Sequence, residues 1–252
     1  MTRAFLLATL ALAAFGLVRL PWEARIEASL RAAGFRESRL GLDLRQQAGQ
    51  LGFAVALGGF RSLAASGLSL RADLAFEDGD WDRLLRLHQI ITKLLPTHLG
   101  YWETAHRHFA YDVPAYYRDH APGLSEGERI RYGVVAIRHG EQLLRDGIRS
   151  HPQSWRLYFA LGALRRNRLA DPCGAAGALA EAARQPGAPA YVPRFHAYAL
   201  SECPGRESEA YTLLRRLYDA GPVHRKPTLI QKLRELEAVL GLPAAAEFQE
   251  SP

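Results

Sequence analysis

Cysteine, lysine and methionine are scarce in this chain. Its 252 residues include two cysteines, one methionine, and lysine only at Lys93, Lys226 and Lys232. Neither Cys173 nor Cys203 belongs to a CxxC motif or a Cys/His cluster, which excludes zinc and thiol redox sites of those types. One disulfide, as expected in an oxidising compartment, and two unpaired thiols are both compatible with this sequence.

Common catalytic signatures are also absent. The sequence contains no G-x-S-x-G, P-loop, H-E-x-x-H or G-x-G-x-x-G pattern. Of the nine histidines, His106 and His108 are two residues apart, which places them on different faces of a helix rather than at the i, i+4 spacing of a ligand pair. We therefore expect His106 to pack between helices, and we predict no catalytic residue, no cofactor and no metal.

Arginine supplies most of the positive charge without forming a basic tract. The formal net charge is +6 and the isoelectric point is about 9.5, which permits contact with nucleic acid or anionic lipid. Because the arginines alternate with acidic residues, a solvated surface of mixed charge is the better interpretation, and no nucleic acid partner is expected. Apolar residues make up 48% of the chain, enough for a substantial core.

The N-terminus carries the longest apolar run. Small and apolar residues extend without interruption from Ala4 to Val18, between Arg3 and Arg19. Continued to position 20, the run has about 17 residues, the short end for a membrane-spanning helix. Residues 1–21 are thus predicted to be a signal anchor or a cleaved signal peptide. The anchor is the preferred interpretation and predicts a single-pass membrane protein with its remainder outside the cytoplasm.

Residues 22–64 are predicted to form a helical segment between the anchor and the following domain. Trp22, Ile26 and Leu30 follow an i, i+4 spacing that indicates an amphipathic helix. A second apolar stretch, 51–70, contains Arg61, and a guanidinium near the centre of a bilayer costs about 2.5–3.5 kcal/mol. We expect this stretch to be a buried helix rather than a second span.

Four prolines indicate a repeated unit in the rest of the chain. Pro96, Pro152, Pro186 and Pro222 each follow a predicted helix, at spacings of 56, 34 and 36 residues. Gly79 and Gly205 precede the first and last of them by 17 residues. Acidic side chains beside the first glycine (Glu77, Asp78 and Asp80) are expected at a turn between helices, where acids commonly cap the next helix.

Local residue patterns agree with this phasing. An aromatic-x-x-Leu-Gly pattern occurs at Tyr158, Leu161 and Gly162, and Trp102 is at the corresponding place after the first proline. Small residues that let paired helices approach occur at Gly140 and Ala210. Together, these features resemble the tetratricopeptide (TPR) family over about residues 65–224. More weakly, the segment Leu57-Gly58-Gly59-Phe60-Arg61 running into Leu70-Arg71-Ala72-Asp73 resembles the entry region of N-terminally anchored bacterial repeat proteins.

The resemblance implies an all-α fold, a TPR-like α-solenoid of antiparallel helix pairs. Its units are placed near 65–98, 99–154, 155–190 and 191–224, and residues 225–252 form a capping helix, over about 227–240, and a tail. The second unit has about 22 extra residues, placed at about 111–128, where prolines interrupt the helical pattern. The tyrosines and acids there mark either a partner surface or a packed loop: Tyr111, Tyr116, Tyr117, Asp112 and Asp119.

In this family partners usually bind the concave face formed by the first helix of each pair. The corresponding positions here are Glu103, Arg107, Tyr111, Arg156, Phe159, Arg166 and Asn167. Converging arginines would suit an acidic peptide or a C-terminal carboxylate, because guanidinium binds carboxylate through two parallel hydrogen bonds. Solvated arginines are the simpler alternative.

The resemblance thus implies a membrane-anchored adaptor or scaffold that binds a protein or peptide, with assembly of a bacterial envelope complex as one expected role. With the anchor, it implies a single-pass protein of a bacterial inner membrane whose repeat domain is in the periplasm. Two alternatives stay open at this level. One is an all-helical envelope enzyme such as a lytic transglycosylase, although no separate catalytic lobe is evident. The other is a structural subunit of a membrane complex.

Overall fold

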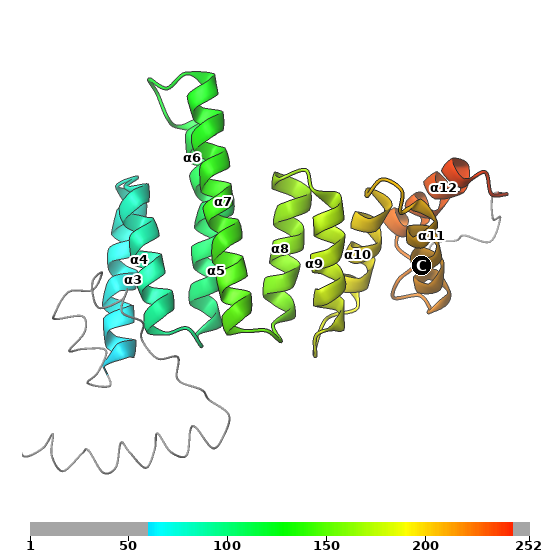
Figure 1. The fold of residues 1–252 in the computed structure, drawn as a ribbon, viewed down its shortest axis with the longest axis horizontal. Helices are drawn as coiled ribbons and strands as arrows, with labels where there is room; N and C mark the ends of the chain where they lie inside the picture. The colour runs from blue at the N-terminus through cyan, green and yellow to red at the C-terminus, as the bar shows by residue number, and fades with distance from the viewer. Residues whose placement is uncertain (1–59, 244–252) are drawn as a thin grey trace, which may run out of the picture. The chain divides into compact units, whose positions relative to one another are not determined.

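Residues 60–243, the part of the chain that the computed structural model describes, are helical throughout and contain no strand (Figure 1). The expected all-α class is confirmed. The predicted anchor at 1–21 and nearly all of the segment 22–64 lie outside these residues. The elements are α3 (Arg61–Glu77), α4 (Trp81–Leu94), α5 (Leu99–Arg107), the π-helix η1 (His108–Asp112), α6 (Val113–Asp119), α7 (Glu126–Ser150), α8 (Trp155–Arg168), α9 (Pro172–Arg184), α10 (Tyr191–Ser201), α11 (Glu207–Asp219) and α12 (Pro227–Leu240).

Proline and glycine punctuate these helices as the sequence predicts. Helices α4, α7, α9 and α11 end two or three residues before Pro96, Pro152, Pro186 and Pro222, because proline lacks an N–H and disfavours a helical preceding residue. Gly79 has a φ of +69°, a left-handed conformation in the α3–α4 turn that glycine adopts without steric cost. The predicted acidic cap is present, since Asp80 accepts a hydrogen bond from the Arg83 backbone N–H at 3.0 Å.

Most helices pack mainly against helices that adjoin them in the sequence, most extensively α3 on α4, α8 on α9, and α9 on α10, whereas α5 and η1 pack mainly on α7. Small residues permit the close approaches. A Cβ atom on Gly140 of α7 would lie 2.8 Å from the backbone nitrogen of Ala110, and one on Gly162 of α8 would lie 2.5 Å from Cγ of Leu179. Both distances are too short for real side-chain atoms, so glycine is required by the packing.

Leucine dominates the buried interior. Three groups of buried side chains follow one another along the chain, the first from α3 to α7, the second from α5 to α9 and the third from α9 to α12. Helix α12, in the expected position, buries Leu229, Ile230, Leu233 and Leu236 on one face. No helix within residues 60–243 is long and apolar enough to cross a membrane.

The extra residues of the second predicted unit do not form the expected interruption around 111–128. The backbone stays helical through Asp119, and only residues 120–125 form a turn. Pro114 is accommodated because the chain passes through the π-helix η1, in which the Val113 N–H donates to the His108 carbonyl oxygen, and proline then occupies the first turn of α6. In consequence, α6 and the beginning of α7 extend beyond the ends of α4 and α8 (Figure 1).

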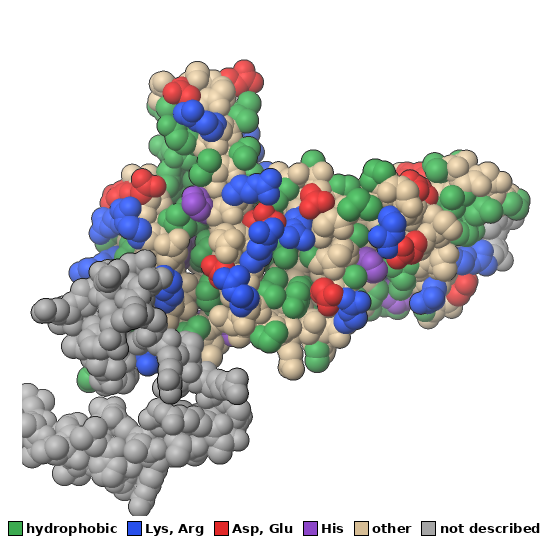
Figure 2. Space-filling view, in the orientation of Figure 1, with side chains coloured by type: hydrophobic (Ala, Val, Ile, Leu, Met, Phe, Trp, Pro, Cys, Tyr) green, Lys and Arg blue, Asp and Glu red, His purple; other side chains and the backbone are tan. Residues whose placement is uncertain are grey.

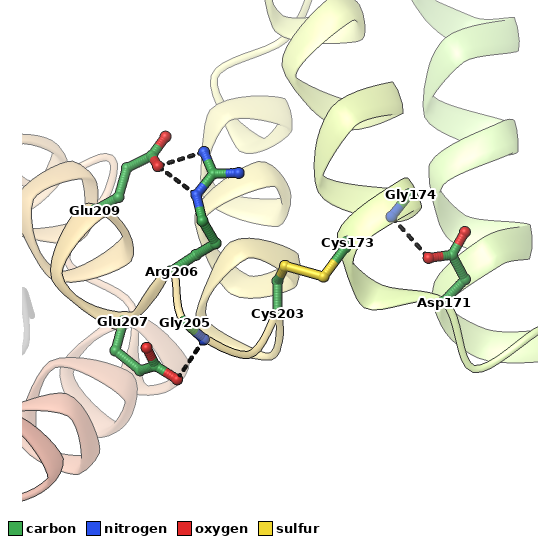
Figure 3. The surroundings of a disulfide bond; sticks show 8 residues. All are labelled: Asp171, Cys173, Gly174, Cys203, Gly205, Arg206, Glu207 and Glu209. Carbon is green, nitrogen blue, oxygen red and sulfur yellow. Dashed lines mark hydrogen bonds and ion pairs between the residues drawn. A yellow bond between two sulfur atoms is a disulfide. The ribbon is translucent and has the colours of Figure 1, made fainter.

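The two cysteines form a disulfide, which settles the alternative that the sequence left open. Cys173 lies in the first turn of α9 and Cys203 in the turn after α10, with Cα atoms 4.8 Å apart (Figure 3). Next to the bond, Asp171 caps α9 by accepting from the Gly174 N–H at 2.8 Å. The covalent bond therefore fixes the start of α9 to the end of α10.

A buried carboxylate joins α7 to α8. Glu141 is 4% exposed and interacts with Arg138 at 3.1 Å, Arg145 at 2.8 Å and Arg165 at 3.1 Å. Arg165 also donates to the carbonyl oxygen of Gly174 at the start of α9. Burial opposes ionisation of Glu141, but its hydrogen bonds to Arg165 and Arg138 outweigh this effect and lower the pKa of the carboxyl group. The network thus stabilises the junction of three helices.

Candidate functional site

The predicted groove residues come from α5, η1 and α8, and the structure brings some of them together. Arg156 Nε of α8 lies 2.8 Å from Glu103 Oε1 of α5. Arg107, one turn after Glu103 on α5, is exposed. The Arg156 guanidinium therefore already has a carboxylate partner inside the protein, which makes it a cross-link between two helices rather than a vacant carboxylate receptor.

Arg166 is similarly engaged. Its Nε and Nη2 donate to the two carboxylate oxygens of Glu202 at 2.7 and 2.6 Å, and Lys232 Nζ lies 3.7 Å from the same carboxylate. The hydrogen bond from Arg166 is the main reason that the pKa of Glu202 is lowered. This pair connects α8 with the end of α10, whereas the neighbouring Asn167 is exposed.

Tyr111, in η1, contacts α8 through an arginine that sequence reasoning did not select. The guanidinium carbon of Arg168 lies 5.2 Å from the centre of the Tyr111 ring, a cation–π distance. Arg168 Nε also donates to the carbonyl oxygen of Ala110 at 3.2 Å. Burial raises the pKa of Tyr111. These contacts hold the π-helix against α8.

Phe159, the remaining predicted residue, belongs to an array of aromatic side chains that we call the aromatic face: Trp155, Phe159, Tyr191 and Phe195. The first two are one turn apart on α8 and the last two one turn apart on α10. Phe159 contacts the other three edge to face, with ring centres 6.4, 5.5 and 5.3 Å apart for Trp155, Tyr191 and Phe195 in turn. All four rings are partly accessible, and Phe195 is 37% exposed.

The aromatic face could have been found from the sequence by comparing units. Trp155 and Tyr191 are 36 residues apart, as are Phe159 and Phe195, and each pair has an i, i+4 spacing. That register places aromatic side chains on equivalent faces of two successive first helices. Of these four residues, only Phe159 is at one of the family's partner-binding positions.

Chemically, the aromatic face is suited to contact rather than catalysis. Partly exposed aromatic rings are enriched at the centres of protein interfaces, because they bury a large area at low entropic cost. Two ion pairs flank it, Arg156–Glu103 and Arg166–Glu202, and Arg194 of α10 donates to the Val223 carbonyl oxygen at 2.8 Å. Polar groups that are already paired leave apolar contact as the main source of binding energy on this face.

Histidines are among the buried and partly buried titratable side chains within residues 60–243. His106 is partly buried on α5, with Nδ1 3.1 Å from the Trp102 carbonyl oxygen of the same helix, and burial lowers its pKa to about 4. His108 lies 3.0 Å from His88, between Nδ1 and Nε2 respectively, in the interior. Within residues 60–243, no three metal-ligating side chains form a group.

Comparisons with known proteins identify no relative: no protein-family model matches the chain, and no curated protein matches it in sequence.

Proposed function

We propose that this chain is a TPR-like repeat protein, held in a bacterial inner membrane by residues 1–21, that binds a protein partner through its aromatic face. The observation that carries the binding proposal is the aromatic face itself. Four rings from α8 and α10 form a continuous, partly accessible surface. Arg156 and Arg166 beside it already pair with carboxylates of the protein, so a partner can bind the rings without supplying a charged group.

Helix pairing supports the repeat assignment. α3 with α4, the α5–η1–α6 segment with α7, α8 with α9, and α10 with α11 correspond to the four units between residues 65 and 224, and α12 follows as the capping helix. The close approach at Gly140, the buried Ala210 and the left-handed turn glycines fall at the family's positions. An insertion of about 22 residues then lengthens the second pair.

The disulfide supports a location outside the cytoplasm. Disulfides persist in oxidising compartments such as the bacterial periplasm and are rare in the cytosol. With residues 1–21 as a signal anchor, the repeat domain would face the periplasm. Alkaline extraction of membranes tests the anchor: the full-length protein should stay with the membrane. A soluble product that begins after residue 21 would instead show that residues 1–21 are a cleaved signal peptide.

A photo-cross-linking experiment tests the binding proposal. A photoreactive phenylalanine analogue is placed at position 195 of the full-length protein, and in a separate sample at position 239, where Val239 of α12 is exposed. The proposal predicts one discrete adduct from position 195 and none from position 239. Phe159→Ser, which removes the ring that contacts the other three, should abolish the adduct. The same adducts from both positions would exclude a specific site at the aromatic face.

A further inference from the structure

A groove lies between the α3–α4 turn and the extended α6–α7 pair. Its walls come from the start of α4, from η1 and α6, and from one face of α7, and its volume is about 410 Å³. That volume falls in the range of sites that take a small ligand or a side chain. The aromatic face lies on α8 and α10, and neither helix contributes to the groove lining, so the two surfaces are distinct.

Aromatic rings form much of the groove wall. Its lining includes Trp81, Phe109, Tyr117 and Tyr132. The Tyr117 and Tyr132 rings stack with centres 5.1 Å apart, and Trp81 meets Tyr116 edge to face at 5.0 Å. The electron-rich faces of such rings attract organic cations. Arg131 shows this attraction at the rim, where its guanidinium carbon lies 5.4 Å from the centre of the Tyr132 ring.

Carboxylates supply the only full charges among the residues that line the groove. Asp80 and Asp82 belong to the lining, which contains neither lysine nor arginine. The Asp80 side chain caps α4 through the Arg83 N–H. Asp82 is exposed and forms no ion pair with a described residue. Its charge is one of the causes that raise the pKa of Tyr117, after burial and Tyr132, which places the carboxylate beside the aromatic wall.

The negative charge continues beyond the groove along the turn. Residues 77–82 contain Glu77, Asp78, Asp80 and Asp82 and no basic residue. Figure 2 shows acidic side chains gathered at this end of the α3–α4 pair, next to the extended α6–α7 pair. A row of carboxylates that leads into an aromatic groove complements a chain with more than one positive charge better than it complements a single small ion.

We infer that this groove binds a basic peptide segment of a partner protein, with an arginine or lysine side chain entering between Asp82 and the aromatic wall. The guanidinium or ammonium group pairs with the Asp82 carboxylate at the mouth. The aliphatic part of the same side chain covers Leu85 and Val135. Val135 is 49% exposed, so the groove wall presents apolar area that a bound side chain can cover.

The test uses the full-length protein in detergent micelles and two acetylated, amidated tetrapeptides. One peptide contains two arginines, and the other contains citrulline, the neutral isostere, at the same places. The indole N–H signal of Trp81, assigned with Trp81→Phe, reports binding in NMR titrations. The arginine peptide should shift this signal with a dissociation constant of about 1 mM or lower, and the citrulline peptide should not.

Two variants make the test specific. Asp82→Asn keeps the shape of an exposed side chain and should weaken binding of the arginine peptide by roughly fivefold or more. Glu126→Gln removes a carboxylate from the first turn of α7, away from the groove, and should leave binding within about twofold because its loss of net charge is the same. Equal binding by the wild type and Asp82→Asn would overturn the inference.

Two further outcomes would also overturn it. Equal shifts with the citrulline peptide would show that the groove does not recognise charge. Stronger binding of choline than of the arginine peptide would assign the groove to a free quaternary ammonium ligand. Because the groove does not include the aromatic face, a failed cross-link at position 195 leaves this titration unaffected, and the two proposals can fail separately.

Discussion

Buried histidines are the residues through which pH acts on the stability of this protein. His88 and His108 share one hydrogen bond in the interior, and the Phe76 ring lies 4.8 Å from that of His108. Burial is the main cause that lowers the pKa of His88 to about 3, and it also lowers the pKa of His108. Both side chains are therefore neutral in the folded state at neutral pH.

Acidification is expected to destabilise the fold well before the carboxylates titrate. The unfolded state has a histidine pKa near 6.5, whereas folded His88 has a pKa of about 3, so the unfolded state binds more protons between these values. The free energy of unfolding should fall as pH decreases through this window, by up to about 1.4 kcal/mol per pH unit for each such histidine. Above pH 6.5 the full stability is present.

Urea unfolding of the wild type and His88→Leu at about pH 7.5 and about pH 5.5 checks this expectation. The variant should be less stable at the higher pH, because His108 loses its hydrogen-bond partner. It should also lose less stability on acidification, because one titrating group is gone. Glu141 and Glu202 have lowered pKa values and titrate below 4.5, outside this range. An equal pH dependence in both proteins would contradict the assignment.

At the scale of helices, glycine sets the separation between α7 and η1. A Cβ atom at position 140 would lie 2.8 Å from a backbone nitrogen and 3.1 Å from the Cα and Cβ atoms of Ala110. Backbone atoms cannot turn aside as the end of a flexible side chain can. The two helices would have to move apart, and the aromatic and leucine side chains around them would lose contact.

Gly140→Ala should therefore destabilise the protein by about 1–3 kcal/mol, the usual range for overpacking. Gly177→Ala provides a matched control in α9, where an added Cβ meets no atom within 4 Å. That change should be neutral or stabilising by up to about 1 kcal/mol, because alanine has the higher helix propensity. Thermal or urea unfolding measures both, and a similar loss in the two variants would show that spacing at Gly140 is not limiting.

Helix boundaries were predictable from the sequence because their causes are local. A proline limits the backbone at its own position and the one before it, as at Pro96, Pro152, Pro186 and Pro222. Gly79 adopts the left-handed conformation that its turn requires, whatever packs around it. The π-helix before Pro114 was not predictable from the sequence. It depends on how the backbone accommodates a proline, which has no N–H to donate, while the segment stays packed on α7. Sequence spacing treated that proline as an interruption, and tertiary packing made it part of a longer helix.

Prediction of the site was limited by partners that lie far apart in the sequence. The family's positions selected Arg156 and Arg166 as charges available to a partner. In the structure, Arg156 of α8 pairs with Glu103 of α5, and Arg166 pairs with Glu202, 36 residues away. Only the folded chain shows that these charges are satisfied. Aromatic side chains on α8 and α10 carried a periodic signal, but their mutual contact needed the packing of α9 between the two helices.

At the scale of the molecule, the disulfide is a covalent bond between the start of α9 and the turn after α10. It joins residues 30 apart in the sequence, across α9 and α10. Cys173→Ala together with Cys203→Ala should lower the free energy of unfolding by about 2–4 kcal/mol. Urea unfolding under oxidising conditions measures the change. Added reductant should lower the stability of the wild type by the same amount and leave the double variant unchanged. Equal stability of the two proteins under oxidising conditions would show that the disulfide does not stabilise the fold.

The position of this disulfide also decides where the protein can lengthen under tension. When force is applied at residues 60 and 243, the chain between Cys173 and Cys203, whose sequence separation is 30, cannot extend, and about 100 Å of contour length is withheld. Extension must begin elsewhere, and the contact between α4 and α5 is less extensive than that between α3 and α4 or between α8 and α9. The chain would thus yield near its N-terminal helices first, while α9 and α10 remain joined by the disulfide.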